Sequence, residues 1–486
     1  MAVGSSIFAL SSGPGRAGIA VIRVSGPAAG EVVAQMAPPL AQPRQAVFRS
    51  IRHPVTGNIL DRAVVIFFEA ARSETGEDVA ELQVHGGRAV VKAVLAALAS
   101  VPGCRPAEAG EFARRAFNNG KLDLAEVEGL ADLVDAETEA QRRQALAQVG
   151  GALSKLYDGW RHELIAISAL TEAAIDFSDE GDVGDKAFAL ARERAAPLNL
   201  AIRRHLEDGH RGEILRDGFR VALLGAPNAG KSSLLNALAK RDAAIVSEEA
   251  GTTRDVIEVR LDLGGLPVIV SDTAGIRESV GAIEREGIKR SFAAARAADL
   301  VLWLSEPGGA PSNPGDLPVD ISRETILRVA TKADLDSASV LVAPPPLWGS
   351  LGGGESKMVA EGTHPTAFLG VPPTPCPSPQ GGGEPDGVAI SAKTGAGIDD
   401  LIAHITQTAS GAIGSQSDPA ITQVRHRQLL ETCAASLNTF LTGDPIQTEL
   451  RAEDLRQAAH GLGRITGRVD VEDILDQVFS RFCIGK

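Results

Sequence analysis

Hydrophobic and polar positions change their period along the chain and so predict regions of different structure. In residues 1–121, apolar runs such as 19–24 have the length of strands, and residues 89–98 have the spacing of a helix. Composition alone favours turns for two glycine-rich segments, 13–18 and 75–87. We therefore predict an α+β domain over residues 1–121.

The pattern turns helical after this domain and again near the end of the chain. Apolar residues from Val127 to Val134 recur at i, i+3, i+4 and i+7, the spacing of one helix face. Helical pattern resumes at Arg425. We expect the second helical piece to pack with the first, which gives one helical domain of residues 122–215 plus 411–486.

Residues 216–410 alternate short apolar runs with helical segments. The predicted strands are residues 221–224, 266–272, 299–304, 326–330 and 388–391. Such alternation predicts a doubly wound, mostly parallel sheet. The predicted fold class is multidomain α/β, with this sheet domain inserted in an all-α domain and preceded by the α+β domain.

One segment of the inserted domain has a composition unlike that of a folded element. Residues 344–387 contain 10 prolines and 10 glycines in 44 positions. Such a stretch buries too little apolar surface to offset the entropy lost on ordering. We predict a disordered surface loop there.

Charge and cysteine usage narrow the function classes. The net charge of −14 does not indicate nucleic-acid binding, so any RNA contact needs a local basic patch. Four scattered cysteines, Cys104, Cys376, Cys433 and Cys483, have neither metal spacing nor a disulfide framework, which suits a reducing compartment. With no secretory or membrane-spanning pattern in the sequence, we expect a cytoplasmic protein.

Residues 225–232, GAPNAGKS, fit the phosphate-loop pattern G-x-x-x-x-G-K-[ST]. An apolar run precedes the motif and good helix formers follow it, so backbone N–H groups and a helix N-terminus can meet a phosphate. Lys231 is expected to reach the β- and γ-phosphates and the Ser232 hydroxyl to ligate Mg²⁺. This context disfavours the alternative, a glycine-rich turn without a ligand. The loop residues assigned to the nucleotide are Asn228, Ala229, Gly230, Lys231, Ser232 and Ser233.

Four further motifs follow in the order that a GTPase needs. Thr253, in a Gly-Thr-Thr-Arg-Asp segment, is placed to ligate Mg²⁺ when the γ-phosphate is present. Asp272 ends a strand, where its carboxylate can hold Mg²⁺ through water. Asp334 can accept two hydrogen bonds from guanine, from N1–H and from the amino group, which adenine cannot supply. The residues of these motifs assigned to GTP are Thr253, Asp272, Thr273, Ala274, Gly275, Thr331, Lys332, Asp334, Ser391, Ala392 and Lys393.

Each short motif recurs by chance, but five in this order favour a GTPase over coincidence. One position departs from the usual Asn-Lys-x-Asp pattern, because Thr331 replaces the asparagine. We expect this change to remove an amide that braces the phosphate loop, with guanine selectivity kept by Asp334 at weaker affinity.

Nearly the whole chain outside the Pro/Gly segment resembles the tRNA-modification GTPase family MnmE, also called TrmE. The resemblance is carried by residues 14–26 (PGRAGIAVIRVSG), 75–87 (TGEDVAELQVHGG), 111–124 (EFARRAFNNGKLDL) and, most specifically, the ending 467–486 (GRVDVEDILDQVFSRFCIGK). It implies a constitutive homodimer held by N-terminal domains that bind a formyl- or methylene-tetrahydrofolate. Carried over by position, the folate residues are Arg23, Glu81, Lys121 and Lys486. Glu74 stands where the family usually has an aromatic residue.

The resemblance also implies a hydrolysis mechanism that depends on potassium. In the family, K⁺ takes the place of an arginine finger and bridges phosphate oxygens. Its ligands by position are Asn228, Ser247, Glu249 and Thr252, of which Ser247 and Thr252 also count as nucleotide contacts. Glu284 matches the acid that positions the attacking water, so the implied catalytic residues are Glu284, Asn228 and Lys231. Cys483 resembles a near-terminal family cysteine, and we assign it no covalent role.

The resemblance implies a K⁺-stimulated GTPase that works with an FAD-dependent partner, in a heterotetramer. Together they are expected to install an aminomethyl or carboxymethylaminomethyl group at carbon 5 of the wobble uridine, position 34, of certain tRNAs, with the folate as one-carbon donor. One alternative is a ribosome-assembly GTPase, which predicts a C-terminal RNA-binding module in place of this acidic helical tail. Another is a non-enzymatic scaffold that responds to folate and GTP.

Overall fold

The structure is a computed structural model. It describes residues 4–177, 181–208, 210–226, 228–241, 243–245, 257–272, 293–306, 326–335, 387–414, 419–469 and 471–485. The predicted positions Ser247, Glu249, Thr252, Thr253, Thr273, Ala274, Gly275, Glu284 and Lys486 lie outside the described residues, as does the 344–387 segment except for its last residue. The chain forms two compact units: residues 1–218, 262–267 and 408–486, and residues 219–261 and 268–407. The three-domain division at residues 121, 215 and 410 stays a prediction.

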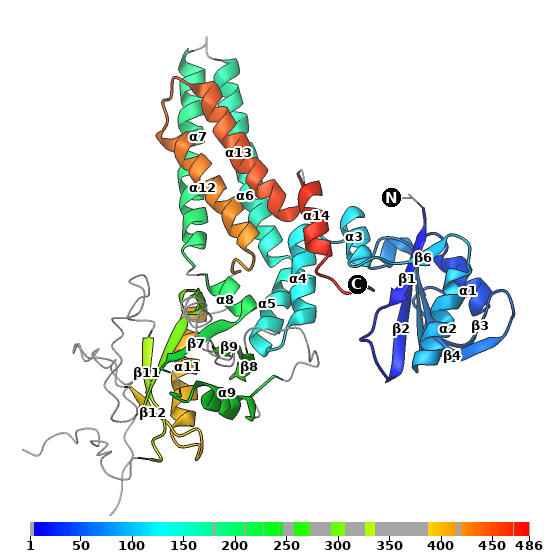
Figure 1. Cartoon of the computed structure of the whole chain (residues 1–486). Helices are drawn as coiled ribbons and strands as arrows, with labels where there is room; N and C mark the ends of the chain where they lie inside the picture. The colour runs from blue at the N-terminus through cyan, green and yellow to red at the C-terminus, as the bar shows by residue number, and fades with distance from the viewer. Residues whose placement is uncertain are drawn as a thin grey trace, which may run out of the picture. The chain divides into compact units, whose positions relative to one another are not determined.

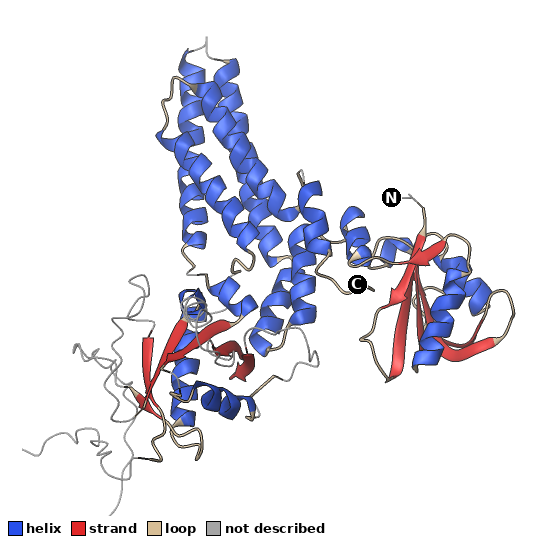
Figure 2. Ribbon diagram, viewed as in Figure 1, coloured by secondary structure: helices blue, strands red, loops and turns tan. Residues whose placement is uncertain are grey.

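The first sheet has six strands in the order β3-β4-β5-β2-β1-β6 (Figure 2). Its strands are β1 (Ser6–Leu10), β2 (Ala17–Ser25), β3 (Val47–Arg52), β4 (Ile59–Phe68), β5 (Val79–Gly86) and β6 (Cys104–Pro106). Neighbouring strands are antiparallel except for the parallel pair β1 and β6. The short helix η1 (Ala70–Arg72) lies between β4 and β5.

The interpretation of residues 75–87 as a turn was wrong for most of that segment. Residues 79–86 form β5, a central strand paired with both β2 and β4. Leu82 and Val84 alternate into the core, so a period of two was present beneath the glycine-rich ends. This strand places Glu81 in the middle of the sheet.

Two helices, α1 (Ala29–Met36) and α2 (Arg88–Ala99), bury their apolar residues against one face of this sheet. Ile22 and Val24 of β2 point to that face and are fully buried. Side chains alternate along a strand, so Arg23 points to the opposite face. Its guanidinium carbon lies 5.9 Å from the ring centroid of Phe112, on a third helix. The two faces of the sheet therefore differ in chemistry.

The helical region is built from two separate segments of the chain, residues 111–217 and 424–479. Its helices are α3 (Glu111–Asn118), α4 (Leu124–Asp135), α5 (Glu139–Val149), α6 (Ala152–Asp176), α7 (Gly181–Leu206), α8 (Arg211–Asp217), α12 (Val424–Thr442), α13 (Thr448–Thr466) and α14 (Glu472–Phe479). Helices α6, α7, α12 and α13 pack side by side (Figure 1). One apolar core joins Leu164 and Ala191 with Leu437 and Leu462. The expected packing of the two helical pieces against each other is present.

The second sheet has the order β12-β11-β10-β7-β9-β8. Its strands are β7 (Phe219–Gly225), β8 (Ile257–Leu263), β9 (Leu266–Asp272), β10 (Leu300–Ser305), β11 (Ile326–Ala330) and β12 (Val388–Ala389), with helices α9 (Lys231–Ala239) and α11 (Ile398–Ile413). The pairs β7–β9, β7–β10, β10–β11 and β11–β12 are parallel. The predicted multidomain α/β class with a mostly parallel sheet is confirmed. Within the described residues, no helix is long and apolar enough to cross a membrane.

Candidate nucleotide-binding site

The phosphate loop joins central strand β7 to helix α9 at the carboxyl ends of the parallel strands, where open α/β sheets bind ligands. Three loop residues have left-handed backbone: Gly225 (φ 151°), Asn228 (φ 65°) and Gly230 (φ 90°). A side chain at Gly225 would place its Cβ 2.4 Å from the carbonyl oxygen of Leu304. The fold therefore requires glycine at the start of the loop, because the neighbouring strand leaves no room for a Cβ.

Lys231 is the first residue of α9 and is buried. Its Nζ donates to the carbonyl oxygens of Gly225 (2.8 Å) and Ala226 (2.9 Å). Burial lowers the pKa of Lys231, since a charged group loses hydration there. The loop thus holds a poorly hydrated cation at a helix N-terminus, a strong combination for binding phosphate oxygens.

Two oxygen-bearing side chains meet beside the loop. The Ser232 hydroxyl donates to Oδ2 of Asp272 over 2.8 Å. Asp272 is the last residue of β9 and is 1% exposed. A hydroxyl and a carboxylate are hard oxygen ligands of the kind Mg²⁺ prefers, so this pair fits a magnesium ion. The partner of Ser232 lies 40 residues away, and only the pairing of β7 with β9 brings the two together.

The residues predicted for guanine gather at the ends of β11 and β12. Ser391 Oγ donates to Oδ1 of Asp334 over 2.7 Å. This hydrogen bond holds the pKa of Asp334 below its ordinary value, so the carboxylate stays ionised and oriented. Lys332 has left-handed backbone (φ 58°) and pairs with Glu306. The sequence assigned Ser391 to GTP but did not predict its side-chain bond to Asp334, because nothing in the local sequence relates two residues 57 positions apart.

Thr331 braces the phosphate loop after all, so the expected loss of a brace was wrong. Its hydroxyl lies 2.8 Å from the carbonyl oxygen of Ala229 and 3.2 Å from that of Ser305, and its side chain is buried. The backbone N–H of Thr331 also donates to Ser305, over 2.8 Å. A threonine hydroxyl therefore supplies the donor that the asparagine amide was expected to give.

This contact gives a direct test. We expect Thr331→Val to weaken GTP binding roughly 5- to 30-fold, because the buried carbonyl of Ala229 loses its donor at a cost of about 1–2 kcal/mol. Thr331→Ser keeps the hydroxyl and should bind GTP nearly as the unchanged chain does. Titration of a fluorescent GTP analogue measures both dissociation constants. Equal affinities for the valine and serine variants would show that the hydroxyl does not brace the loop.

The structure accordingly places most of the predicted nucleotide residues at one end of one sheet. Those within the described residues are Asn228, Ala229, Gly230, Lys231, Ser232, Ser233, Asp272, Thr331, Lys332, Asp334, Ser391, Ala392 and Lys393. Loop, magnesium pair and guanine motif all follow strands β7, β9, β11 and β12.

Known proteins similar to this chain include GTPases, and the similarity covers nearly the whole chain. Residues 6–121 match the family model described as the GTP-binding protein TrmE N-terminus, and residues 124–483 match the model of the MnmE helical domain. A tRNA modification GTPase MnmE of Methylobacterium radiotolerans is 50% identical over 484 residues, covering 99% of each chain. The chain belongs to the MnmE family.

Other proteins of the same name are similar to this chain to nearly the same degree. The tRNA modification GTPase MnmE of Parvibaculum lavamentivorans is 50% identical and covers 99% of this chain and 100% of its own. That of Caulobacter vibrioides is 47% identical over 99% of both chains. Among solved structures, the G domain of the T. maritima FeoB iron transporter covers 39% of this chain and 98% of its own at 20% identity, but its TM-score of 0.24 is too low to support a conclusion.

Two of the residues expected to hold folate, Arg23 and Glu81, lie on the first sheet, on the face opposite α1 and α2. Arg23 and Glu81 face each other across β2 and β5, with Arg23 Nη2 3.0 Å from Glu81 Oε1. Arg23 Nη1 also lies 2.8 Å from Glu74 Oε2. The position where the family usually has an aromatic residue thus carries a second acid for the same arginine. Lys121 Nζ donates to the carbonyl oxygen of Ala71 over 2.9 Å, three residues before Glu74.

Proposed function

We propose that this chain binds GTP with Mg²⁺ and hydrolyses it as part of tRNA modification. The observation that carries the proposal is the joint placement of Lys231, the Ser232–Asp272 pair and the Asp334–Ser391 pair along one sheet edge. Lys231 would neutralise charge on the transferred phosphoryl group, Ser232 and Asp272 would hold the Mg²⁺ that supplies further positive charge there, and Asp334 would select guanine. Membership of the MnmE family supports GTP hydrolysis and a tRNA substrate.

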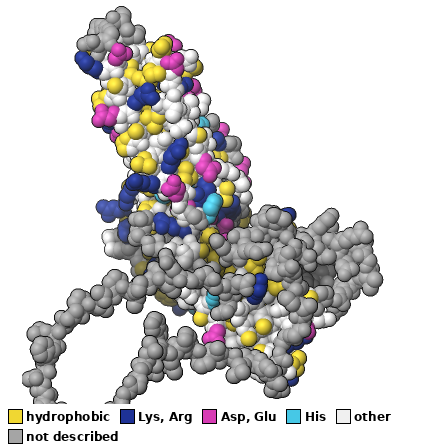
Figure 3. Space-filling model, turned by 90° about the vertical axis from the view of Figure 1, so that its left-hand side faces the viewer, with side chains coloured by type: hydrophobic (Ala, Val, Ile, Leu, Met, Phe, Trp, Pro, Cys, Tyr) yellow, Lys and Arg dark blue, Asp and Glu magenta, His cyan; other side chains and the backbone are white. Residues whose placement is uncertain are grey.

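The finer chemistry rests on the family resemblance. With an FAD-dependent partner, the chain would modify carbon 5 of the wobble uridine, with a tetrahydrofolate as one-carbon donor. GTP hydrolysis would drive conformational cycling of the complex and not the carbon chemistry. The homodimer held by N-terminal domains and the cytoplasmic location are proposals of the same kind. For tRNA itself, Figure 3 adds support, since Lys and Arg side chains gather over part of the helical bundle despite the acidic total charge.

Potassium is the proposed substitute for an arginine finger. Asn228 lies on the phosphate loop with left-handed backbone, a position from which its side-chain oxygen can serve a cation beside the phosphates. The other proposed ligands, Ser247, Glu249 and Thr252, and the proposed water-positioning acid Glu284 lie outside the described residues.

Steady-state GTP hydrolysis in KCl and in NaCl at equal ionic strength tests this proposal. We expect K⁺ to raise turnover roughly tenfold or more, and Asn228→Ala to abolish most of the difference, as expected when a group that stabilises transition-state charge is removed. Asn236→Ala, on the exposed face of α9, is the matched control and should keep the K⁺ response. Equal turnover in both salts would contradict the cation site. Absence of multiple turnovers in either salt would favour the scaffold alternative.

The folate site has its own test, in which the two acids beside Arg23 serve as a matched pair. We expect Glu81→Gln to weaken binding of 5-formyl-tetrahydrofolate roughly 10- to 100-fold, because a carboxylate that accepts from the pterin amino group is lost. Glu74→Gln removes a more exposed acid from the same arginine and should not weaken binding. Titration calorimetry measures both. Equal losses of folate affinity in the two variants would contradict a direct contact of Glu81 with the pterin, and would mean that both acids act only by holding Arg23.

A further inference from the structure

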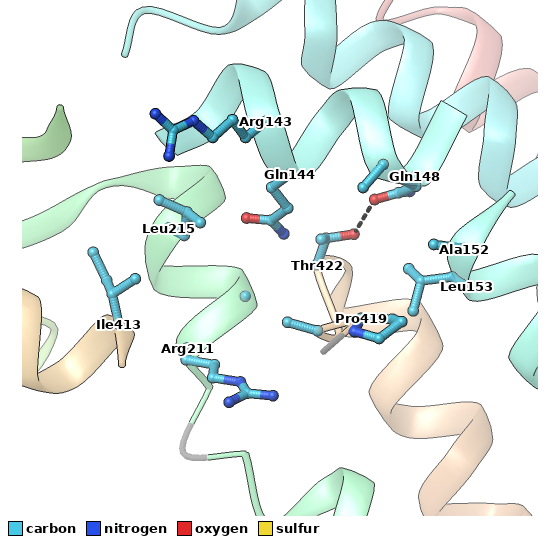
Figure 4. Close-up of a pocket in the computed structure, with 13 residues that line it drawn as sticks. Arg143, Gln144, Gln148, Ala152, Leu153, Arg211, Leu215, Ile413, Pro419 and Thr422 are labelled. Atoms are coloured by element: carbon cyan, nitrogen blue, oxygen red, sulfur yellow. Dashed lines mark hydrogen bonds between the residues drawn. The ribbon is translucent and has the colours of Figure 1, made fainter. Parts of the chain in front are cut away.

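A pocket of about 280 Å³ lies in the helical region, and none of the residues that line it is among the nucleotide residues described above. Its wall is formed by helices α5 and α8, the start of α6, the end of α11 and the segment just before α12 (Figure 4). All lining residues belong to the same compact unit. Nothing in the proposed GTPase or folate chemistry uses these residues, so the pocket needs a separate explanation.

Most of the pocket wall is apolar or already satisfied. Leu153, Leu215 and Ile413 are 2–3% exposed and give it apolar sides. Gln148, on α5, accepts a hydrogen bond from the Thr422 hydroxyl over 3.0 Å and donates to the carbonyl oxygen of Ala125 over 2.9 Å. These two polar side chains therefore do not call for a ligand.

Two other polar groups of the wall are not satisfied. The amide of Gln144 points into the space between α5 and α8 (Figure 4), and both its Nε2 and its Oε1 are buried with no hydrogen-bond partner in the described structure. The Nε of Arg211, on α8, is also buried without a partner. Arg143 differs from Arg211, because its guanidinium pairs with Glu139 over 2.7 Å. Buried polar atoms without partners are rare in folded proteins and often mark a bound molecule.

We propose that this pocket binds a small carboxylate with an apolar body and one further N–H or O–H donor. The planar guanidinium of Arg211 matches a carboxylate at one end of the ligand. The ligand's donor satisfies Gln144 Oε1, which lies apart from Arg211 on the other side of the pocket (Figure 4). The apolar body lies against Leu153, Leu215 and Ile413. The volume is near the lower limit of small-molecule sites, so the ligand is no larger than a single-ring or short-chain acid.

Two of the segments that line the pocket connect the helical region to residues 219–407. They are α8, which precedes those residues in the chain, and residues 419–422, which follow them. Helix α8 ends at Asp217, just before β7. A Cβ on Gly212 of α8 would lie 2.3 Å from the carbonyl oxygen of Ile421, so the two segments already touch through their backbones. A ligand in the pocket adds contacts to α8 and to residues 419–422, and so restrains these two segments.

Binding of 4-hydroxyphenylacetate, measured by ligand-observed NMR on the full chain, tests the proposal. We expect saturable binding at millimolar or lower concentration, roughly tenfold weaker for both Arg211→Gln and Gln144→Leu, since each removes a buried polar contact. The neutral 4-hydroxyphenylacetamide should bind about tenfold more weakly than the acid. In the unchanged chain, the probe should also slow amide hydrogen exchange in residues 211–217 and 419–424.

Arg203→Gln, on an exposed position of α7, is the control and should bind the probe as the unchanged chain does. Melting temperatures equal to that of the control show that the pocket variants are folded; if Arg211→Gln unfolds, Gln144→Leu and the acid–amide comparison still decide. Three results would each overturn the proposal. They are no binding of the probe up to about 10 mM, well above the expected concentration, equal binding of acid and amide, and unchanged binding by a folded pocket variant. None of these results depends on GTP hydrolysis.

Discussion

Replacing Asp334 by asparagine is expected to lower kcat/KM for GTP roughly 10²- to 10⁴-fold. Two charge-assisted hydrogen bonds to guanine N1–H and the amino group are lost or weakened, and each contributes about 1.5–3 kcal/mol. The asparagine amide can instead donate to the carbonyl that xanthine carries in place of the amino group. Preference should therefore move from GTP toward xanthosine triphosphate.

Hydrolysis of the two nucleotides by the same preparations gives the specificity ratio directly. Asp400→Asn, an exposed acid on α11 of the same sheet domain, is the matched control and should keep full GTP selectivity. Because Asp334 is exposed and Ser391 remains to hold the new amide, the variant should keep its melting temperature. A variant with unchanged preference for GTP would remove Asp334 from the base site.

Replacing Lys231 by methionine is expected to lower kcat/KM for GTP roughly 10²- to 10³-fold. The ammonium pairs with the β- and γ-phosphates, and loss of one group that stabilises the transition-state charge costs about 3–4 kcal/mol. The free energy of unfolding of the variant should rise or stay unchanged. Burial lowers the pKa of Lys231, which means that burying the charged ammonium costs free energy. The apolar methionine side chain of similar length does not have this desolvation cost.

This opposite response separates a functional lysine from a structural one. Turnover and thermal melting are measured on Lys231→Met and on Lys240→Met, whose side chain is exposed just beyond the last residue of the same helix. The Lys240 variant should match the unchanged chain in both. If Lys231→Met lost stability together with activity, the bonds from Nζ to Gly225 and Ala226 would be the reason for its burial, and the phosphate role would lose its support.

In residues 75–87, an alternating strand pattern was present, but the glycines of the segment led to the prediction of a turn. Glycines at 76, 86 and 87 favoured a turn, while Ala80, Leu82 and Val84 already alternated toward one face. Strand β8 (Ile257–Leu263) was not predicted at all, although Leu261 and Leu263 also alternate into a core. Short alternating segments give a weak signal, because packing against neighbouring strands, and not local preference, makes them strands.

Position 331 shows the limit of comparing residues one at a time. Threonine lacks the asparagine amide, and from sequence this reads as a lost contact. In the fold, β10 pairs with both β7 and β11, and this brings the Thr331 hydroxyl within 2.8 Å of the carbonyl oxygen of Ala229, 102 residues earlier. A shorter donor on a buried residue can replace a longer one when the backbone lies close enough.

The sequence by itself determined the order and chemistry of the motifs. Phosphate loop, magnesium aspartate and guanine aspartate are local patterns whose residue types dictate what they can bind, and their order along alternating strands fixes a parallel sheet with all of them at its carboxyl edge. The helical pattern on both sides of residues 219–407 likewise required two separated pieces to share a core, since neither can bury its apolar face alone.

Only the tertiary structure decided which polar groups meet. The bonds Ser232–Asp272, Ser391–Asp334 and Thr331–Ala229, the arginine shared by Glu74 and Glu81, and the pocket that Gln144 and Arg211 line all depend on distances between segments far apart in the chain. Hydrogen bonds act over about 3 Å, a range that strand pairing and helix packing set and that residue spacing along the chain does not encode.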